Sequence, residues 1–260
     1  MHWYCIPNHL PVITKSVYQM DKLERAYFYF MSVTNEDCMA LMARYPDKYF
    51  ELALVDPPYG IGAAKVGVGN SQKARQKKDI KGGDWDSKVP DDAYFEELFR
   101  VSKNQIICGA NYFRLPPTRG IICWDKGKCM RGRDFSEWEF LWSSFDRVAR
   151  LFYFDMLAGQ GFIRGNQSRI GQKIHPTQKP IQLYKWLLTN YAKSGDKILD
   201  THLGSGSSRI AAYDLGFDFT ACELDADYFA AQEKRFAEHV ITHGNMMFKP
   251  DNTIVKTSLF

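Results

Sequence analysis

Two short segments of the sequence carry residue types that suit the transfer of a one-carbon group. The first is DPPYG at positions 56–60, which follows the apolar run at 51–55. An exocyclic amine on an aromatic ring is a poor nucleophile, because its lone pair is delocalised into the ring. The Asp56 carboxylate and the Pro57 carbonyl could accept its two N–H hydrogens and aim the lone pair at a methyl sulfonium. Tyr59 offers a ring on which a base could stack.

The same tetrapeptide also has a plainer interpretation. Two consecutive prolines fix the backbone, so PPY alone is more typical of a proline turn covered by an aromatic side chain. The strand-like run before it and the acid in front of the prolines favour the chemical interpretation. The carboxyl end of a parallel strand is where open α/β sheets bind their ligands.

The second segment is the glycine loop DTHLGSGS at positions 200–207, between a strand-like run and a helical pattern. Glycines there let backbone N–H groups and a helix N-terminus approach a ligand closely. Glu223 follows Gly204 by 19 residues (223 minus 204), a distance at which an acid can accept hydrogen bonds from both ribose hydroxyls. A nicotinamide dinucleotide would use the same arrangement, although Arg209 stands where the third glycine of that fingerprint would fall.

The composition is that of an ordinary soluble globular protein. Of its 260 residues, 45% are hydrophobic and 25% charged, which predicts one domain with a large core. The net charge of +4, from 34 basic and 30 acidic residues, is compatible with nucleic acid without pointing to it. The six cysteines are scattered without metal-ligand spacing, so we expect free thiols, no metal site and a cytoplasmic protein. No apolar run approaches the ~20 residues that span a membrane.

Strand-like and helical patterns alternate along most of the chain. Apolar periodicity predicts helices that begin near residues 36, 91, 180, 207 and 226. Short apolar or β-branched runs predict strands at 32–34, 51–55, 105–108, 120–124, 138–142, 197–200 and 219–223. Such alternation predicts an α/β fold with a doubly wound, mostly parallel sheet.

Two segments interrupt this alternation. Residues 61–89 contain seven basic and three acidic residues, and residues 158–175 are rich in glycine, arginine and lysine. Irregular segments of this length inside a compact domain usually serve a function, although solvated surface loops remain the alternative. Their charge favours contact with phosphates.

Together, DPPY and DTHLGSGS resemble the amino-methyltransferase family of DNA modification enzymes. The resemblance covers roughly residues 32–240 and extends to GANYF (109–113), WDKG (124–127), SEWEFLW (136–142) and HPTQKP (175–180). The tetrapeptide precedes the glycine loop, which resembles the circularly permuted beta arrangement of that family. The resemblance implies a Rossmann-like methyltransferase fold with a seven-stranded sheet.

The resemblance also implies a methyl donor and roles for individual residues. S-adenosylmethionine would be the cofactor. The flipped-out base would be held by Asp56, Pro57, Pro58 and Tyr59. The cofactor would be bound by Asp37, Lys179, Asp200, Gly204, Ser205, Gly206 and Glu223. The family loop usually reads Asp-Pro-Phe, whereas this chain has Thr201 and His202 after Asp200, so one aromatic wall of the cofactor site is missing.

We expect double-stranded DNA as the partner. Lys73, Arg75, Lys77 and Lys78 lie in the basic loop at 61–89, where they would meet phosphates. Arg131 and Arg133, with Arg164 and Arg169 of the small recognition element at 158–175, are the candidates for base contacts. The resemblance is compatible with a homodimer.

The predicted domain organisation has three parts. Residues 1–30 show no clear period and are expected to be an N-terminal extension. Residues 31–245 form the methyltransferase domain, and residues 246–260 form a C-terminal tail.

The function predicted from these motifs is direct in-line methyl transfer to the N6 amine of adenine in DNA, on a flipped-out base and without a metal. A cytosine-N4 enzyme is the first alternative, although relatives of that specificity more often carry serine in place of Asp56. A non-catalytic module that binds the cofactor and DNA is the second. The absence of a Pro-Cys dipeptide argues against C5-cytosine enzymes, which need a thiolate nucleophile.

Overall fold

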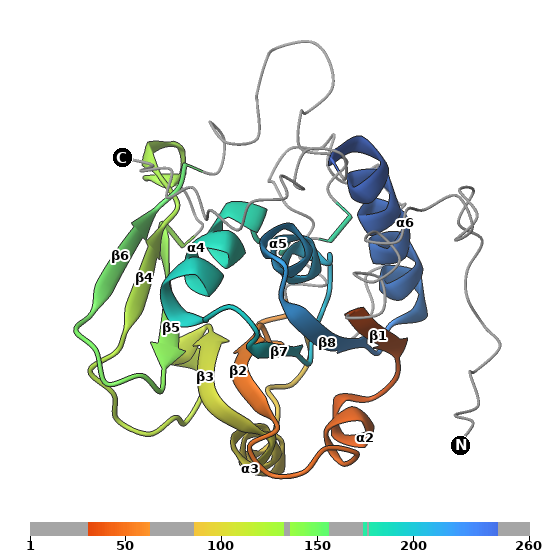
Figure 1. Cartoon of the computed structure of the whole chain (residues 1–260). Coiled ribbons are helices and arrows are strands. Elements are labelled where there is room, and N and C mark those ends of the chain that lie inside the picture. The colour runs from red at the N-terminus through yellow and green to blue at the C-terminus, as the bar shows by residue number, and fades with distance from the viewer. Residues whose placement is uncertain (1–30, 63–85, 133–135, 156–173, 176, 244–260) are drawn as a thin grey trace, which may run out of the picture.

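The computed structural model describes residues 31–62, 86–132, 136–155, 174–175 and 177–243. These residues form a twisted eight-stranded sheet in the order β1-β8-β7-β2-β3-β5-β4-β6 (Figure 1). The strands are β1 (Met31–Asn35), β2 (Phe50–Val55), β3 (Ser102–Cys108), β4 (Ile122–Asp125), β5 (Trp138–Ser143), β6 (Arg150–Tyr153), β7 (Lys197–Asp200) and β8 (Asp218–Glu223). All neighbours pair in parallel except β5, which runs antiparallel to both β3 and β4.

Helices cover both faces of the sheet, as Figure 1 shows. One face carries α4 (Ile181–Tyr191), α5 (Ser207–Leu215) and α6 (Ala226–His243), and the other carries α2 (Cys38–Met42) and α3 (Asp92–Val101). The core is correspondingly divided. Leu183 and Leu187 of α4 pack on one side of the sheet, and Leu41 of α2 and Leu98 of α3 pack on the other.

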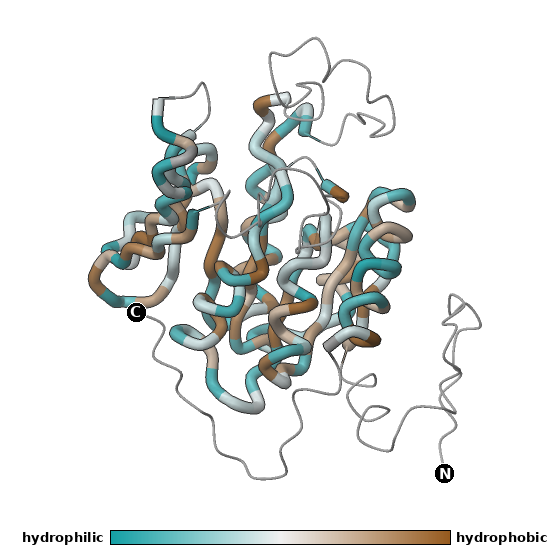
Figure 2. The backbone as a smooth tube through the Cα atoms, turned by 90° about the horizontal axis from the view of Figure 1, so that it is seen from above, coloured by the Kyte–Doolittle hydropathy of each residue, from teal (hydrophilic) through white to brown (hydrophobic). Residues whose placement is uncertain are grey.

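Buried apolar side chains explain this layering. Strands buried on both faces are continuously apolar, as in the Ala53, Leu54 and Val55 run of β2, whose side chains are at most 1% exposed. The helices instead alternate hydrophilic and hydrophobic residues along their length, which Figure 2 shows by colour. The doubly wound α/β fold predicted from the sequence is therefore confirmed.

The sheet has one strand more than the seven expected. The additional strand is β6, which pairs in parallel with β4 at the edge of the sheet. Its side chains at Leu151 and Tyr153 are exposed, so the sequence around it lacks the apolar contrast that marks the central strands.

The first helix is short. Helix α2 ends at Met42, and its N-cap is Asp37, whose carboxylate accepts hydrogen bonds from Met39 N and Ala40 N. Asn35 is the last residue of β1. Its side-chain amide donates to the carbonyls of Glu223 and Leu224.

Parallel register brings several strand ends to one edge of the sheet. Asn35 of β1 lies opposite Glu223 of β8, and Val55 of β2 lies opposite Ile107 of β3. Strand β7, which ends at Asp200, lies between β8 and β2. The DPPY segment and the glycine loop are therefore neighbours in space, although their first residues, Asp56 and Asp200, are 144 positions apart in the sequence.

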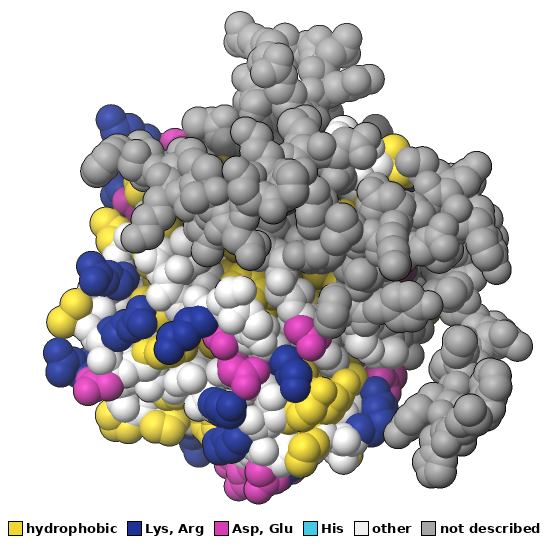
Figure 3. All heavy atoms as spheres, viewed as in Figure 1, with side chains coloured by type: hydrophobic (Ala, Val, Ile, Leu, Met, Phe, Trp, Pro, Cys, Tyr) yellow, Lys and Arg dark blue, Asp and Glu magenta, His cyan; other side chains and the backbone are white. Residues whose placement is uncertain are grey.

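The described surface carries both signs of charge. On the face shown in Figure 3, lysine and arginine side chains alternate with aspartate and glutamate, without a single-sign field among the coloured residues. In the described part of the chain, no helix is both long and apolar enough to cross a membrane. The segments predicted as extension (1–30) and tail (246–260), and most of 61–89 and 158–175, lie outside the described residues.

Candidate active site

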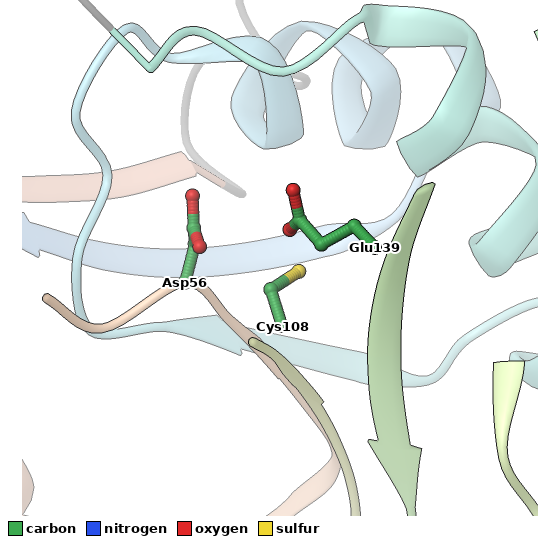
Figure 4. Close-up of side chains that lie close together, drawn as sticks. All are labelled: Asp56, Cys108 and Glu139. Atoms are coloured by element: carbon green, nitrogen blue, oxygen red, sulfur yellow. The ribbon is translucent and has the colours of Figure 1, made fainter. Parts of the chain in front are cut away.

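Side chains along a strand point alternately to its two faces, and this brings polar residues from the ends of four strands to one face of the sheet. On β2, Leu52 and Leu54 pack on the α4 side, so the next position on that face is Asp56. The core residues Ile106, Trp124 and Leu141 lie on this same face. Side chains two residues away from them therefore also lie on it, and these are Cys108 of β3, Lys126 just after β4 and Glu139 of β5. Figure 4 shows the side chains of Asp56, Cys108 and Glu139 converging above the sheet.

Lys179 completes this group from the segment just before α4. Its Nζ lies 2.5 Å from Asp56 Oδ2, 2.9 Å from the Tyr59 hydroxyl and 3.0 Å from Glu139 Oε1. The Tyr59 hydroxyl lies 2.7 Å from Asp56 Oδ1 and 2.9 Å from Glu139 Oε1. Lys126 Nζ lies 3.3 Å from Glu139 Oε2. We call Asp56, Tyr59, Lys126, Glu139 and Lys179 the charged cluster.

Burial and mutual attraction set the protonation of Asp56, Tyr59 and Lys179 within this cluster. Burial alone would lower the pKa of Lys179, but the carboxylates of Asp56 and Glu139 outweigh it and raise that pKa, so the ammonium stays charged. Burial raises the pKa of Asp56, an effect that Lys179 opposes and Glu139 reinforces. Burial likewise raises the pKa of Tyr59 well above its usual value, so its hydroxyl keeps the proton that it donates.

A buried aspartate fixes the backbone of the tetrapeptide. Oδ1 of Asp86 accepts hydrogen bonds from Tyr59 N at 2.7 Å and Gly60 N at 2.8 Å, and the Asp86 residue is only 2% exposed. Asp86 lies at the end of the segment predicted as a basic DNA-binding loop. In this structure, Asp86 holds the turn that carries Tyr59.

The Tyr59 ring is held by aromatic and backbone contacts. Its centroid lies 4.7 Å from that of Tyr112, with the two planes 12° from parallel. Tyr112 belongs to a 3₁₀ turn (Ala110–Tyr112) that begins after Gly109, whose φ is +74°. These contacts orient the Tyr59 hydroxyl toward the carboxylates.

The glycine loop forms the second half of the site. Gly204 N donates to Glu223 Oε2 at 2.7 Å, and Gly206, with φ +73°, precedes the first turn of α5. Asp200 is 1% exposed and accepts hydrogen bonds from His202 N at 3.0 Å and the Ser208 hydroxyl at 2.5 Å. The loop backbone is therefore fixed by the two acids that flank it in sequence.

The two halves are joined directly. The Ser207 hydroxyl donates to the backbone carbonyl of Lys179 at 2.8 Å, and the Ser205 hydroxyl lies 3.2 Å from that of Ser207. The residue whose ammonium contacts Asp56 is thus anchored through its backbone to the glycine loop. Asp37, beyond the end of β1, is exposed, and the preceding residue lies beside the end of β8, since Glu36 N donates to Glu223 O at 3.2 Å.

Comparison with known proteins agrees with this arrangement. The N6/N4 methyltransferase family model, described as DNA methylase, matches residues 121–234. The putative methylase YubD of Escherichia coli K12 is 24% identical over 216 residues, which cover 77% of this chain and 88% of that protein. The type II methyltransferase M2.DpnII of Streptococcus pneumoniae is 38% identical over 61 residues, 24% of this chain and 23% of that protein.

The resemblance to the DNA amino-methyltransferase family is confirmed, because residues 121–234 match the DNA methylase family model and the curated relatives are described as methylases. The fold agrees with that of a solved structure. The PvuII DNA methyltransferase, described as cytosine-N4-specific, has a TM-score of 0.50 and 13% identity, and the match covers 84% of this chain and 94% of that one. The M1.HpyAVI–SAM complex has a TM-score of 0.48 and 17% identity, with 79% and 98% covered. S-adenosylmethionine is the methyl donor of this methylase family, as the sequence motifs implied.

Distances alone would allow a metal ion in this methylase site. One ligand atom each of Asp56, Cys108 and Glu139 lies within 4.8 Å of the others. Lys179 already bonds both carboxylates, however, and supplies the positive charge that an ion would bring. Burial raises the pKa of the Cys108 thiol well above its usual value, so this sulfur is a poor ligand.

The methylase loop departs from its family pattern at His202. Burial lowers the pKa of His202 to about 4, so its ring is neutral at physiological pH. The ring lies edge-on to Tyr94, with centroids 5.2 Å apart and planes at 75°. Tyr94 of α3 also shares a hydrogen bond of 2.7 Å with Thr201. The two residues that replace the usual Pro-Phe are therefore both packed against Tyr94.

Of the predicted DNA contacts, only Arg131 lies within the described residues. It is exposed and pairs with Asp125 at 2.7 Å and with Glu137 at 3.7 Å. The other seven lie outside the described residues: Lys73, Arg75, Lys77, Lys78, Arg133, Arg164 and Arg169.

Three residues of the methylase site were not assigned by sequence reasoning, namely Asp86, Lys126 and Glu139. Glu139 and Lys126 lie in segments quoted for the resemblance, but without a role. One signal was available, because Glu139 is a charged residue inside the otherwise apolar WEFLW run. Lys179, expected beside the cofactor, has its ammonium in the charged cluster with Asp56.

Proposed function

We propose that this methylase transfers the methyl group of S-adenosylmethionine to the N6 amine of adenine in duplex DNA. The observation that carries this proposal is the Asp56 carboxylate. It lies at the carboxyl end of β2, 18% exposed, with its two oxygens bound by Lys179 and Tyr59. Each oxygen retains a lone pair, so the carboxylate can accept an amine hydrogen without losing its present partners.

The chain's own residues explain how such an amine would become nucleophilic. Asp56 and the Pro57 carbonyl would accept its two hydrogens, which draws the nitrogen lone pair out of conjugation with the ring. Asp86 fixes the backbone at Tyr59 and Gly60, so both acceptors are held in place before the base arrives. Preorganised acceptors need no rearrangement in the transition state, which is where they lower the barrier. Pro58 adds stiffness to the same turn, and Tyr59 contributes a ring at the base.

The neighbouring loop fits the cofactor. Bound S-adenosylmethionine supplies an electrophilic methyl group on sulfur. Gly204 and Gly206 have positive φ values of +53° and +73°, which side chains rarely adopt, and they leave the loop backbone open to close approach. Glu223, whose pKa burial raises, lies within reach of Gly204 N and would accept ribose hydroxyls. Asp200 and Ser205 would hold the loop, and Asp37 would approach the adenine of the cofactor.

Adenine is favoured over cytosine by the first residue of the tetrapeptide. Cytosine-N4 relatives more often have serine where this chain has Asp56. The amine and the adjacent ring nitrogen present the same donor and acceptor in both bases, so the size of the pocket also matters. Residues 31–245 form the proposed catalytic domain. The basic residues at 73–78, with Arg131, Arg133, Arg164 and Arg169, are the proposed DNA contacts.

The decisive experiment is identification of the product. The purified chain is incubated with isotopically labelled S-adenosylmethionine and unmethylated duplex DNA of mixed sequence, and the DNA is digested to nucleosides. We expect the label in N6-methyladenine. Label in N4-methylcytosine would change the substrate base and leave the methylase reaction intact. Cofactor and DNA binding without labelled product would identify a non-catalytic module.

A further inference from the structure

Glu139 of β5 is a second largely buried carboxylate beside Asp56, and the function proposed above does not use it. Its side chain is 12% exposed, and its Oε1 lies 2.9 Å from the Tyr59 hydroxyl and 3.0 Å from Lys179 Nζ. Its Oε2 lies 3.3 Å from Lys126 Nζ. Removing a carboxylate from water costs several kcal/mol before its partners compensate, so such a residue beside a catalytic acid calls for an explanation.

Lys179 has as many acceptors as it has hydrogens. An ammonium group carries three N–H hydrogens. Its three acceptors are Asp56 Oδ2, the Tyr59 hydroxyl and Glu139 Oε1, all within 3.0 Å. At 4% exposure, the side chain is also closed to solvent. Lys179 therefore acts on a bound base through Asp56, and Glu139 supplies one third of its coordination.

The charges of the cluster balance only when Glu139 is counted. Asp56 and Glu139 are negative, and Lys126 and Lys179 are positive, so the buried group is neutral. Without Glu139, the charged cluster would keep two ammonium groups, those of Lys126 and Lys179, and one carboxylate, that of Asp56. A carboxylate beside excess positive charge is a weaker acceptor for a third partner, because its electron density is already drawn toward the ammonium groups.

We propose that Glu139 is a positioning residue for methyl transfer. It holds Lys179 and Tyr59 against Asp56 and balances their charge, so that Asp56 keeps its capacity to accept the hydrogens of the target amine. This inference rests on the proposed function, since it requires a target amine at Asp56.

A charge role makes a directional prediction about pH. Asp56 must be ionised to accept the amine hydrogens. Its pKa therefore sets the pH below which the rate of methyl transfer falls, which is the acid limb of the pH–rate profile. Burial raises the pKa of Asp56, Lys179 lowers it and Glu139 raises it. Loss of the negative charge at Glu139 must therefore lower that pKa, and loss of the positive charge at Lys126 must raise it. The other ionisable groups around Asp56 remain in every variant; they are Tyr59, Cys108, Lys179, Tyr184 and Asp200.

The test compares Glu139→Gln with Lys126→Met in the full chain. Glutamine keeps an oxygen that accepts from Lys179 and Tyr59, so this exchange removes the charge and retains the shape. Methyl transfer from labelled S-adenosylmethionine to mixed-sequence duplex DNA is measured from pH 5 to pH 9. Glu51→Gln is the matched control, because Glu51 also pairs with a lysine (Lys103, 2.9 Å) but lies at the opposite end of β2.

We expect Glu139→Gln to lower kcat about fivefold or more, less than the ~10²-fold expected from loss of a direct acceptor. Its acid limb should move to lower pH, that of Lys126→Met should move to higher pH, and Glu51→Gln should match the wild type. A merely structural role would lower kcat without opposite shifts of the two limbs.

The outcomes separate the inference from the function on which it rests. An active wild type with an unchanged kcat and acid limb in Glu139→Gln overturns the role of Glu139 and leaves the methylase function standing. A wild type that transfers no methyl group to DNA overturns the proposed function itself. If thermal melting shows that Glu139→Gln is unfolded, Lys126→Met decides, and an acid limb that stays in place or moves to lower pH overturns the inference.

Discussion

The backbone of Gly109 lies so close to the ring of Tyr59 that a Cβ atom at position 109 would stand 2.3 Å from Cε1 of the tyrosine. The next two atoms of that ring would be 2.6 and 2.8 Å away. Real side chains do not tolerate such distances, so any other residue at 109 must push the Tyr59 ring aside. The orientation of a residue in the DPPY tetrapeptide therefore depends on a glycine at the end of β3.

Gly109→Ala is predicted to lower methyl transfer by about 10²-fold, because a displacement near 1 Å at a reacting site has an effect of that size. Gly195→Ala is the matched control. Its φ of +87° imposes a similar backbone strain, of about 1–2 kcal/mol, but nothing lies within 4 Å of its Cβ position. Gly195→Ala should lose stability through backbone strain alone, Gly109→Ala should lose more because the Tyr59 ring must also move, and only Gly109→Ala should lose activity. Equal activities would show that the Tyr59 ring can move without consequence.

Asp56→Asn should reduce kcat by about 10²-fold or more and leave binding of S-adenosylmethionine near that of the wild type. The asparagine amide keeps the shape of the side chain but presents a donor where the amine needs an acceptor. Turnover and calorimetric titration of the cofactor measure the two effects separately. A folded variant with wild-type turnover would contradict the role of Asp56.

Glu223→Ala should weaken cofactor binding by about 1.5–3 kcal/mol, the usual range for a lost hydrogen bond to a charged acceptor. The structure adds a reason for the upper part of that range, because Glu223 also holds Gly204 N at 2.7 Å. Isothermal titration measures the change. Asp218→Asn, at the other end of β8, is the control and should bind normally. An unchanged dissociation constant in Glu223→Ala would place the ribose elsewhere.

His202→Phe is predicted to reduce the loss of stability at acidic pH. The folded pKa of His202 is lowered to about 4 by burial, below the ordinary value of 6.5, so the unfolded chain binds a proton first as the pH falls. Stability from the neutral ring is complete above pH 6.5 and is lost between pH 6.5 and pH 4. Between pH 7.5 and pH 5 the wild type therefore loses about 2 kcal/mol of its free energy of unfolding. Phenylalanine does not titrate, so His202→Phe does not show this loss.

Denaturant unfolding at these two pH values tests this prediction. The wild type and His202→Phe should differ in the pH dependence of the free energy of unfolding, whatever their difference at pH 7.5. Parallel pH dependences would show that the ring is not buried in its neutral form.

Local sequence was sufficient to predict the strands that carry the chemistry and the residues at their ends. The apolar runs before Asp56, Asp200 and Glu223 are strands β2, β7 and β8, because continuous burial on both faces leaves a continuous apolar signal. The motifs DPPY and DTHLGSGS predicted the family, since both depend on residues that are close together in the chain. Strand β6 had no comparable signal, because its side chains at Leu151 and Tyr153 face solvent.

The partners of Asp56 were decided by the tertiary structure. Alternation places Lys126 and Glu139 on a definite face of their own strands, but sequence does not give the order or the direction of the strands in the sheet. Strand β5 runs antiparallel to β3, so the beginning of β5, where Glu139 lies, reaches the edge at which β2 and β3 end. Burial and mutual attraction then determine the protonation of Asp56, Glu139 and Lys179, because each charge is stabilised by side chains that are distant in the chain.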